Sequence, residues 1–260
     1  DTAVAVTGEV VFVGYGVTAP EYRWDDFKGQ DMQGRILVFL VNDPPAPPEE
    51  PDLFGGRAMT YYGRWTYKYE EAERRGAAGA LLVHMRETAG YGWSVIESSW
   101  TGEQLSLPRE PDRPPPLAIE GWITRDFARR LFESAGLSLN ELAARAARRD
   151  FRPVPTGITL QASVPAFARR LETANVVGLV PGRHPERQQE VVIYTAHYDH
   201  LGIGPVVNGD SIYNGAYDNA SGVAAMLEIA EAFARLRPGP DRSVLFMATA
   251  AEEAGLLGAS

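Results

Sequence analysis

Apolar runs alternate with turn-forming residues over the first part of the chain. The runs GEVVFVGYGV and GRILVFLV are rich in β-branched and aromatic side chains and are bounded by Gly and Asp, a pattern typical of strands. They are followed by NDPPAPPEEP, residues 42–51, whose consecutive prolines exclude both a helix and a strand ladder. The pattern predicts strands within residues 8–42 and then a loop.

Helical spacing begins after this loop. The stretch YYGRWTYKYEEAERRG predicts a helix of about 15 residues that ends at Gly76, because glycine favours the left-handed conformation common at helix ends. Short strands are predicted at residues 80–83 and 117–119. The stretches TRDFARRLFESAG and SLNELAARAARRD predict two further helices, opened by Thr and Ser.

The pattern changes near residues 151–170. TANVVGLVPG and EVVIYTAH predict strands, and residues 221–237 predict an amphipathic helix that ends at Pro238-Gly239. Residues 242–250 form a fully apolar run, as expected for a parallel strand that is covered on both faces. The final stretch AEEAGLLGAS predicts the start of another helix. This alternation of strands and helices favours an α/β layer.

Composition narrows the classes of function. The chain has 260 residues, a formal charge of −9 and four histidines, and the negative charge argues against a nucleic-acid partner. It has no cysteine, which excludes disulfides, thiol nucleophiles and Cys-based zinc sites, so any metal must be held by His, Asp and Glu. No apolar run approaches the roughly 18 residues of a membrane span.

Two histidines and an aspartate lie in YTAHYDHLG, residues 194–202, directly after an apolar run. His197 and Asp199 are two positions apart near the end of a strand, so their side chains leave the same face. A metal-bound imidazole commonly donates its other N–H to a carboxylate, the role for which Asp199 is placed. The alternative is a core histidine that pairs with a surface acid.

Three more acids follow two later elements. Asp218 precedes the amphipathic helix in NGAYDNASG, where it can either cap the helix or bind a metal. Glu252 and Glu253 follow the apolar strand, where paired acids usually form a solvated face. However, ligand sites of α/β sheets form at the carboxyl ends of the strands. If the strands that precede His197 and Glu253 are neighbours, His197, Asp218 and Glu253 can converge.

The ligand types suggest a reaction. One imidazole with several carboxylates suits Zn²⁺ and tolerates related divalent ions. Two metal ions about 3.5–4 Å apart can share Asp218 and activate water. The free carboxylate of Glu252 can take the proton of that water and pass it to a leaving amine. That chemistry is peptide hydrolysis.

The three stretches AHYDHLG, NGAYDNASG and AEEAGLLGAS resemble, in order, the motifs of the two-zinc aminopeptidase family that includes glutamate carboxypeptidase. The resemblance implies that His197 binds one zinc ion, oriented by Asp199, and that Asp218 bridges both ions. Glu253 then binds the second ion, and Glu252 is the general base. It also implies a cis peptide bond after Asp218.

A second resemblance covers most of the remaining chain. GYGVTAPEYRWDDFKGQDMQGRILVFLVNDPP and WTYKYEEAERRGAAGALLVH resemble the protease-associated (PA) domain, a β-rich α+β insert that supplies no catalytic residue in most of these peptidases. We therefore expect a PA domain over residues 8–160, with residues 1–7 as a connection from a segment upstream. Within this reading His84 is structural. In the remaining part His184 is solvated, and His200, whose role is left open between a support of the site and none, is not counted as a ligand.

Residues 161–260 then correspond to the N-terminal half of a peptidase domain. The expected fold class is α/β, a partial three-layer sandwich with a mostly parallel sheet and flanking helices. The family pattern requires a further acid and histidine after residue 260, so the chain is interpreted as an interior fragment with weak metal affinity and little hydrolysis of its own. The incomplete sheet is expected to favour self-association.

The sequence thus predicts a secreted or periplasmic zinc exopeptidase that removes N-terminal residues from peptides. The compartment is an expectation from the family alone. Three alternatives stay open: a carboxypeptidase of the glutamate carboxypeptidase type, a one-zinc glutaminyl cyclase, and a receptor-like relative without catalysis. Retention of His197, Asp218, Glu252 and Glu253 argues against the receptor-like relative.

Overall fold

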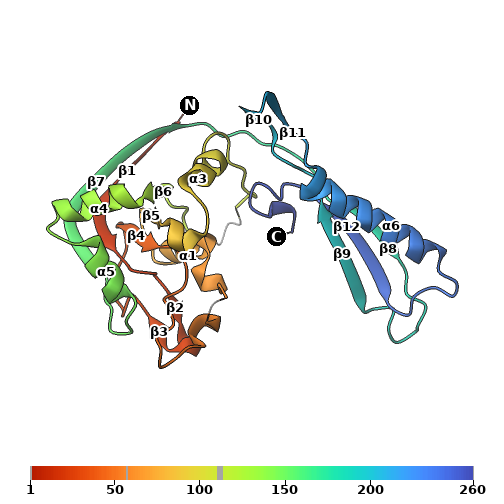
Figure 1. Cartoon of the computed structure of the whole chain (residues 1–260), viewed down its shortest axis with the longest axis horizontal. Helices are drawn as coiled ribbons and strands as arrows, with labels where there is room; N and C mark the ends of the chain where they lie inside the picture. Colours follow the sequence, from red (N-terminus) through yellow and green to blue (C-terminus); the bar gives the residue numbers. More distant parts are fainter. Residues whose placement is uncertain (1, 57, 110–113, 260) are drawn as a thin grey trace. The chain divides into compact units, whose positions relative to one another are not determined.

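The computed structural model describes residues 2–56, 58–109 and 114–259. It contains two compact units (Figure 1). The first comprises residues 1–102 and 109–168, and the second comprises residues 103–108 and 169–260. The predicted limits of the PA domain and of the peptidase half stay predictions, and each unit is described by itself below.

The first unit is built on a five-stranded sheet with the order β6-β5-β4-β1-β7. Neighbouring strands from β1 to β6 are parallel, and β7 is antiparallel to β1. β1 starts at Thr2, so residues 2–7 are part of the sheet. The strands are β1 (Thr2–Phe12), β4 (Ile36–Leu40), β5 (Gly79–His84), β6 (Ile119–Thr124) and β7 (Val154–Ala166), and the short strands β2 (Thr18–Ala19) and β3 (Trp24–Asp25) pair separately.

Helices cover both faces of this sheet. They are α1 (Trp65–Arg74), α2 (Arg86–Ala89), α3 (Trp93–Trp100), α4 (Arg125–Ser134) and α5 (Leu139–Ala146), with short 3₁₀ turns η1 (Pro20–Tyr22), η2 (Leu53–Gly55) and η3 (Tyr61–Gly63). The predicted capping residues act as expected: Thr124 and Ser138 accept hydrogen bonds from backbone N–H groups in the first turns of α4 and α5. Gly76, with φ of +66°, follows α1, which confirms the prediction of a left-handed glycine at that end.

Two apolar clusters pack on opposite faces of the first sheet. One contains Phe12 and Val38 with Phe132 of α4 and Leu142 of α5. The other contains Phe39 with side chains of α1 and of the loops. Because alternate residues of a strand point to opposite faces, an apolar run such as Ile36–Leu40 supplies both clusters.

The second unit is built on a three-stranded sheet with the order β8-β12-β9. β9 is parallel to β12, and β8 is antiparallel to it. Helix α6 lies along one face of this sheet (Figure 1). The elements are β8 (Val176–Val180), β9 (Val191–His197), the hairpin of β10 (Gly202–Val207) and β11 (Asp210–Tyr213), the turn η4 (Ala216–Ala220), α6 (Ser221–Arg235), β12 (Ser243–Thr249) and η5 (Leu257–Ala259).

The core of the second unit is small. Tyr194 of β9 stacks on Phe246 of β12 with ring centroids 5.5 Å apart, and Met226 of α6 belongs to the same cluster. The strand alternation places Ile193 on the opposite face. There Ile193 is 55% exposed, and Leu179 of β8 is 57% exposed.

The predicted α/β class is confirmed, and the structure corrects several elements. The strand expected at residues 117–119 is β6, which pairs with β5 from Ile119 onward. Glu120 and Gly121 interrupt the apolar run, so the sequence pattern did not indicate a strand there. Helix α1 has 10 residues rather than about 15, because η3 and Arg64, with extended backbone, precede it. The hairpin β10–β11 and helix α3 were not predicted.

The helix expected at the end of the chain is also wrong. Residues 251–259 form turns and η5, and Ser260 lies outside the described residues. Ala251 and Leu256 have positive φ angles, which a helix does not allow. Polar side chains stabilise the turn instead: Asn175 accepts a hydrogen bond from the N–H of Ala250 at 3.0 Å and donates one to the carbonyl of Gly258 at 2.6 Å.

Among the described residues, no helix combines the length and apolar character that crossing a bilayer requires.

Candidate metal centre

The predicted site residues follow the carboxyl ends of two neighbouring strands. His197 is the last residue of β9 and is paired in register with Thr249, the last residue of β12. Glu252 and Glu253 follow β12 within four residues. The two strands are parallel neighbours, so their carboxyl ends lie at the same edge of the sheet.

Three donors come together at this edge. One ligand atom from each of His197, Asp218 and Glu253 lies within 4.8 Å of the other two. His197 Nε2 is 3.0 Å from Asp218 Oδ1. The imidazole is buried, whereas the side chain of Asp218 is 65% exposed, so the site combines a fixed nitrogen with an acid open to solvent.

Asp218 is located in the turn η4 just before α6, and its peptide bond to Asn219 is cis, as the resemblance implies. The alternative role of Asp218 was to cap the helix. In the structure Asn219 takes that role, because its Oδ1 accepts a hydrogen bond from the N–H of Gly222 at 3.0 Å. The carboxylate of Asp218 is directed to His197 instead.

Asp199 supports two other residues of the site. Its main-chain carbonyl oxygen lies 3.0 Å from His197 Nδ1, while its carboxylate is 3.8 Å from that nitrogen. The carboxylate accepts hydrogen bonds from the N–H groups of Glu252 at 3.0 Å and Glu253 at 3.2 Å. Asp199 therefore orients His197 through its backbone and holds the Glu252-Glu253 pair through its side chain.

The electrostatics of the site follow from one imidazole among several acids. Burial lowers the pKa of His197, but the hydrogen bond to Asp199 and the carboxylates of Glu252 and Asp218 outweigh burial, so the pKa is raised overall. Glu252 Oε2 is 3.7 Å from His197 Nε2. Burial raises the pKa of Glu252, as do the carboxylates of Glu253, Asp218 and Asp199, against the opposing effect of His197.

His200 contacts the site through Glu253. Its Nδ1 is 2.7 Å from Glu253 Oε1, and both side chains are 22% exposed. The sequence suggested a supporting position for His200 but not its partner. The spacing of three residues from His197 was the available signal, and the direction of the ring depends on the loop that follows β9.

The donor set fits a divalent cation such as zinc. Zinc binds imidazole nitrogen and carboxylate oxygen at about 2.0–2.2 Å, so ligand atoms in a tetrahedral site lie about 3.4 Å apart. The observed separations, from 3.0 Å to at most 4.8 Å, are close to that value. His197, Asp218 and Glu253 are therefore the residues of this chain that would bind zinc.

The other two histidines lie elsewhere, and His184 is less exposed than the expected solvated position. Buried His84 ends β5; its Nε2 is 3.1 Å from the carbonyl of Tyr91, and its ring packs against Trp93 and Trp122. Half-buried His184 is part of the turn between β8 and β9, where its Nδ1 accepts a hydrogen bond from the N–H of Glu186 at 3.2 Å.

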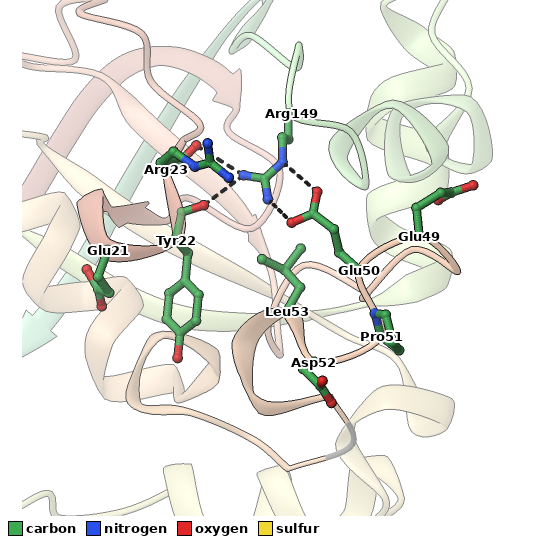
Figure 2. A pocket seen from close by; sticks show the side chains of 9 residues that line it. All are labelled: Glu21, Tyr22, Arg23, Glu49, Glu50, Pro51, Asp52, Leu53 and Arg149. Carbon is green, nitrogen blue, oxygen red and sulfur yellow. Dashed lines mark hydrogen bonds and ion pairs between the residues drawn. The ribbon is translucent and has the colours of Figure 1, made fainter.

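A pocket of about 410 Å³ in the first unit offers a contrast. Its central cation, Arg149, is already occupied: the guanidinium donates to the carbonyl oxygens of Tyr22 and Arg23 and to both oxygens of Glu50 (Figure 2). This arrangement links three segments of the first unit. The pocket is lined by Glu21, Tyr22, Arg23, Glu49, Glu50, Pro51, Asp52, Leu53 and Arg149, and it contains none of the predicted site residues.

Comparison with known sequences identifies the part of the chain that carries the metal centre. Residues 175–260 match the profile of peptidase family M28. Over this segment the chain is similar to that family. All of the candidate site residues, from His197 to Glu253, lie within the M28 segment.

Individual relatives match stretches of 87 to 108 residues. A "Probable zinc metalloprotease" of Pyricularia oryzae is 35% identical over 108 residues, which cover 40% of this chain and 20% of that protein. "Aminopeptidase YwaD" of Bacillus subtilis is 37% identical over 87 residues, covering 33% of this chain and 16% of that protein. The chain thus spans about a fifth of the length of these relatives.

Among solved structures, an aminopeptidase from Aneurinibacillus sp. strain AM-1 aligns with 98% of this chain and 45% of its own. The identity is 20% and the TM-score is 0.38. A peptidase M28 precursor from Shewanella amazonensis covers 98% of this chain and 46% of its own, at 17% identity and a TM-score of 0.37.

Proposed function

We propose that this chain carries one part of the active site of a zinc-dependent exopeptidase that removes N-terminal residues from peptides. The observation that carries the proposal is the convergence of His197, Asp218 and Glu253 at the carboxyl ends of β9 and β12. The names of the relatives, a probable zinc metalloprotease and an aminopeptidase, support zinc as the metal and aminopeptidase as the type.

In this proposal His197 and Asp218 would hold one zinc ion, and Asp218 and Glu253 would hold a second. When bound, the ions would supply Lewis acidity that polarises the scissile carbonyl and lowers the pKa of water. Each zinc ion would have only two ligands from the described residues, fewer than the three that a catalytic zinc normally has. The proposal therefore includes further ligands from polypeptide outside residues 1–260.

Glu252 is the proposed general base. Its carboxylate lies beside the imidazole of a metal ligand and is one-third exposed, so it can accept a proton from water and deliver it to the leaving amine. A pKa above the usual value for glutamate makes it a better proton acceptor. Hydrogen bonding of its N–H to Asp199 keeps its backbone in place.

Zinc titration of the chain tests the proposed metal site. We expect weak but specific binding in isothermal titration calorimetry with ZnCl₂. We expect His197→Ala to lower the affinity by at least about 10-fold, since it removes the nitrogen donor from the three converging groups. Equal affinities of the wild type and His197→Ala would contradict the site. Two zinc ions per polypeptide in a longer, active protein would favour a peptidase over a one-zinc cyclase.

Hydrolysis provides a second test. Residues 1–260 alone are expected to show little or no turnover of an aminoacyl-anilide with added Zn²⁺, because the ligand set is incomplete. Robust turnover by this chain would contradict the proposed need for further ligands. In the longer protein, faster removal of an N-terminal residue than of an acidic C-terminal residue from a peptide would favour the aminopeptidase over the carboxypeptidase.

A further inference from the structure

We propose that His200 is a positioning residue that holds the side chain of Glu253 in the orientation needed to bind a metal ion. This inference rests on the proposed function and deepens it. It assigns a purpose to a histidine that is not among the three converging donors but touches one of them.

The contact is a short hydrogen bond to a carboxylate. His200 Nδ1 lies 2.7 Å from Glu253 Oε1. An ionised carboxylate only accepts hydrogen bonds, so Nδ1 is the donor. Because the carboxylate has two oxygens, a bond to Oε1 limits rotation of the group and leaves Oε2 to coordinate a cation. Such supporting hydrogen bonds orient metal ligands and tune the affinity of a site.

The position of His200 is itself determined by close packing. A Cβ atom added to Gly215 would lie 2.9 Å from both Cβ and Cγ of His200, closer than van der Waals contact allows. Gly215 also has a φ of +63°, which favours glycine. His200 therefore contacts Glu253 on one side and packs against the residue that precedes the Asp218 turn on the other.

The neighbouring residue completes the support. Asp199 accepts a hydrogen bond from the N–H of Glu253, while His200 donates one to its carboxylate. Two consecutive residues after β9 thus hold both the backbone and the side chain of a residue that follows β12. The side chain of Glu253 would otherwise have three rotatable bonds to order when a metal ion binds.

The test compares two substitutions at the same position. His200→Leu places a side chain of similar bulk against Gly215 but has no hydrogen-bond donor. His200→Asn places an amide N–H near the position of Nδ1. In calorimetric titration of the chain with ZnCl₂, we expect His200→Leu to weaken zinc binding by about 10- to 100-fold. We expect His200→Asn to stay within about threefold of the wild type, because the hydrogen bond can form again.

His184→Ala is the matched control, since it removes a histidine from the turn that precedes β9 rather than from the site. It should leave zinc affinity unchanged. Thermal unfolding in EDTA reports whether each variant is folded, and the comparison of Asn with Leu stays decisive because both replace the imidazole.

The outcomes separate this inference from the proposed function. Loss of binding in His197→Ala with unchanged binding in His200→Leu would overturn only the positioning role. If zinc binding is weakened equally in His200→Leu and His200→Asn, the positioning role is overturned as well, because restoring a hydrogen-bond donor would then have no effect on zinc affinity. If the wild type binds zinc no more tightly than His197→Ala does, the metal site itself is overturned, and the positioning role with it.

Discussion

In the first unit the side chain of Phe39 is completely buried, whereas in the second unit Ile193, in an equally apolar strand, is 55% exposed. The first sheet has packed clusters on both faces. The second sheet has one small cluster on the face that α6 covers. Yet the converging imidazole and carboxylates belong to the second unit. Burial of apolar surface and the groups capable of metal chemistry are therefore concentrated in different parts of the chain.

This difference has a consequence for stability. A donor set for a divalent cation needs several acids close together, and their mutual repulsion and desolvation oppose folding until a cation is bound. A unit with a large core can tolerate such strain better than a unit with a small one. The second unit combines four acids around His197 and His200 with a small core, so its stability should depend on a bound metal ion more than that of the first unit does.

Replacement of the proposed general base, Glu252, should have the largest effect on activity. It tests whether the chemistry belongs to the second unit and not to the first. In a longer, active protein, Glu252→Gln should lower kcat by about 10²- to 10⁴-fold, because the amide cannot accept the proton from water. Zinc content should be unchanged, as measured by metal analysis. Arg149→Gln, in the pocket of the first unit, is the control and should leave kcat unaltered. An equal loss of kcat in Arg149→Gln would mean that the first unit takes part in the reaction.

Core truncations test the contrast in packing. Phe39→Ala in the first unit should lower the free energy of unfolding by about 3–5 kcal/mol, because it removes a completely buried ring and leaves a cavity. Ile193→Ala should lower it by only roughly 1 kcal/mol, since much of that side chain is already in water. Urea unfolding followed by hydrogen exchange in β4 and β9 gives both values. Similar losses would contradict the proposed contrast.

A buried lysine, Lys68, should make the stability of the first unit depend on pH. Burial lowers the pKa of Lys68 to about 7, against the opposing effects of Asp26, Asp43 and Glu71. Above pH 7 the unfolded chain binds a proton at Lys68 that the folded state has released, so stability should rise with pH. We expect a gain of about 1 to 2 kcal/mol between pH 7 and pH 8.5 from this group.

The measurement is the difference in unfolding free energy between the wild type and Lys68→Met over that pH interval. Lys28→Met, which replaces the only other lysine, is the control and should preserve the gain. A flat difference between the wild type and Lys68→Met would show that Lys68 keeps an ordinary pKa in the folded state.

Substitutions of two helix caps, one in each unit, should have the smallest effect on stability and can be compared directly. Thr124→Ala in the first unit and Asn219→Ala in the second each remove a hydrogen bond to a backbone N–H at a helix start, at a cost of about 1 kcal/mol. Only Asn219→Ala should also weaken zinc binding, because it loosens the turn that carries Asp218. Equal zinc affinity of the two variants in calorimetry would contradict that link.

Much of the site could be predicted from the sequence because its signals are local. The apolar runs that end at His197 and before Glu252 placed those residues at strand ends, and both runs are strands in the structure. The donor types suggested a divalent cation. The partner of the Asp199 carboxylate could not be predicted, because the N–H groups of Glu252 and Glu253 lie more than fifty residues away along the chain.

By itself the sequence determined the α/β class, most of the elements and the identity of the candidate donors, since periodicity, caps and residue chemistry are properties of neighbouring positions. Tertiary structure alone decided that β9 and β12 are neighbours, that Asn219 rather than Asp218 caps α6, and that His200 points to Glu253. It also replaced the expected final helix by a turn, because Asn175 and Asp199 bind the backbone there. These choices depend on contacts between residues far apart in the sequence, which local patterns do not encode.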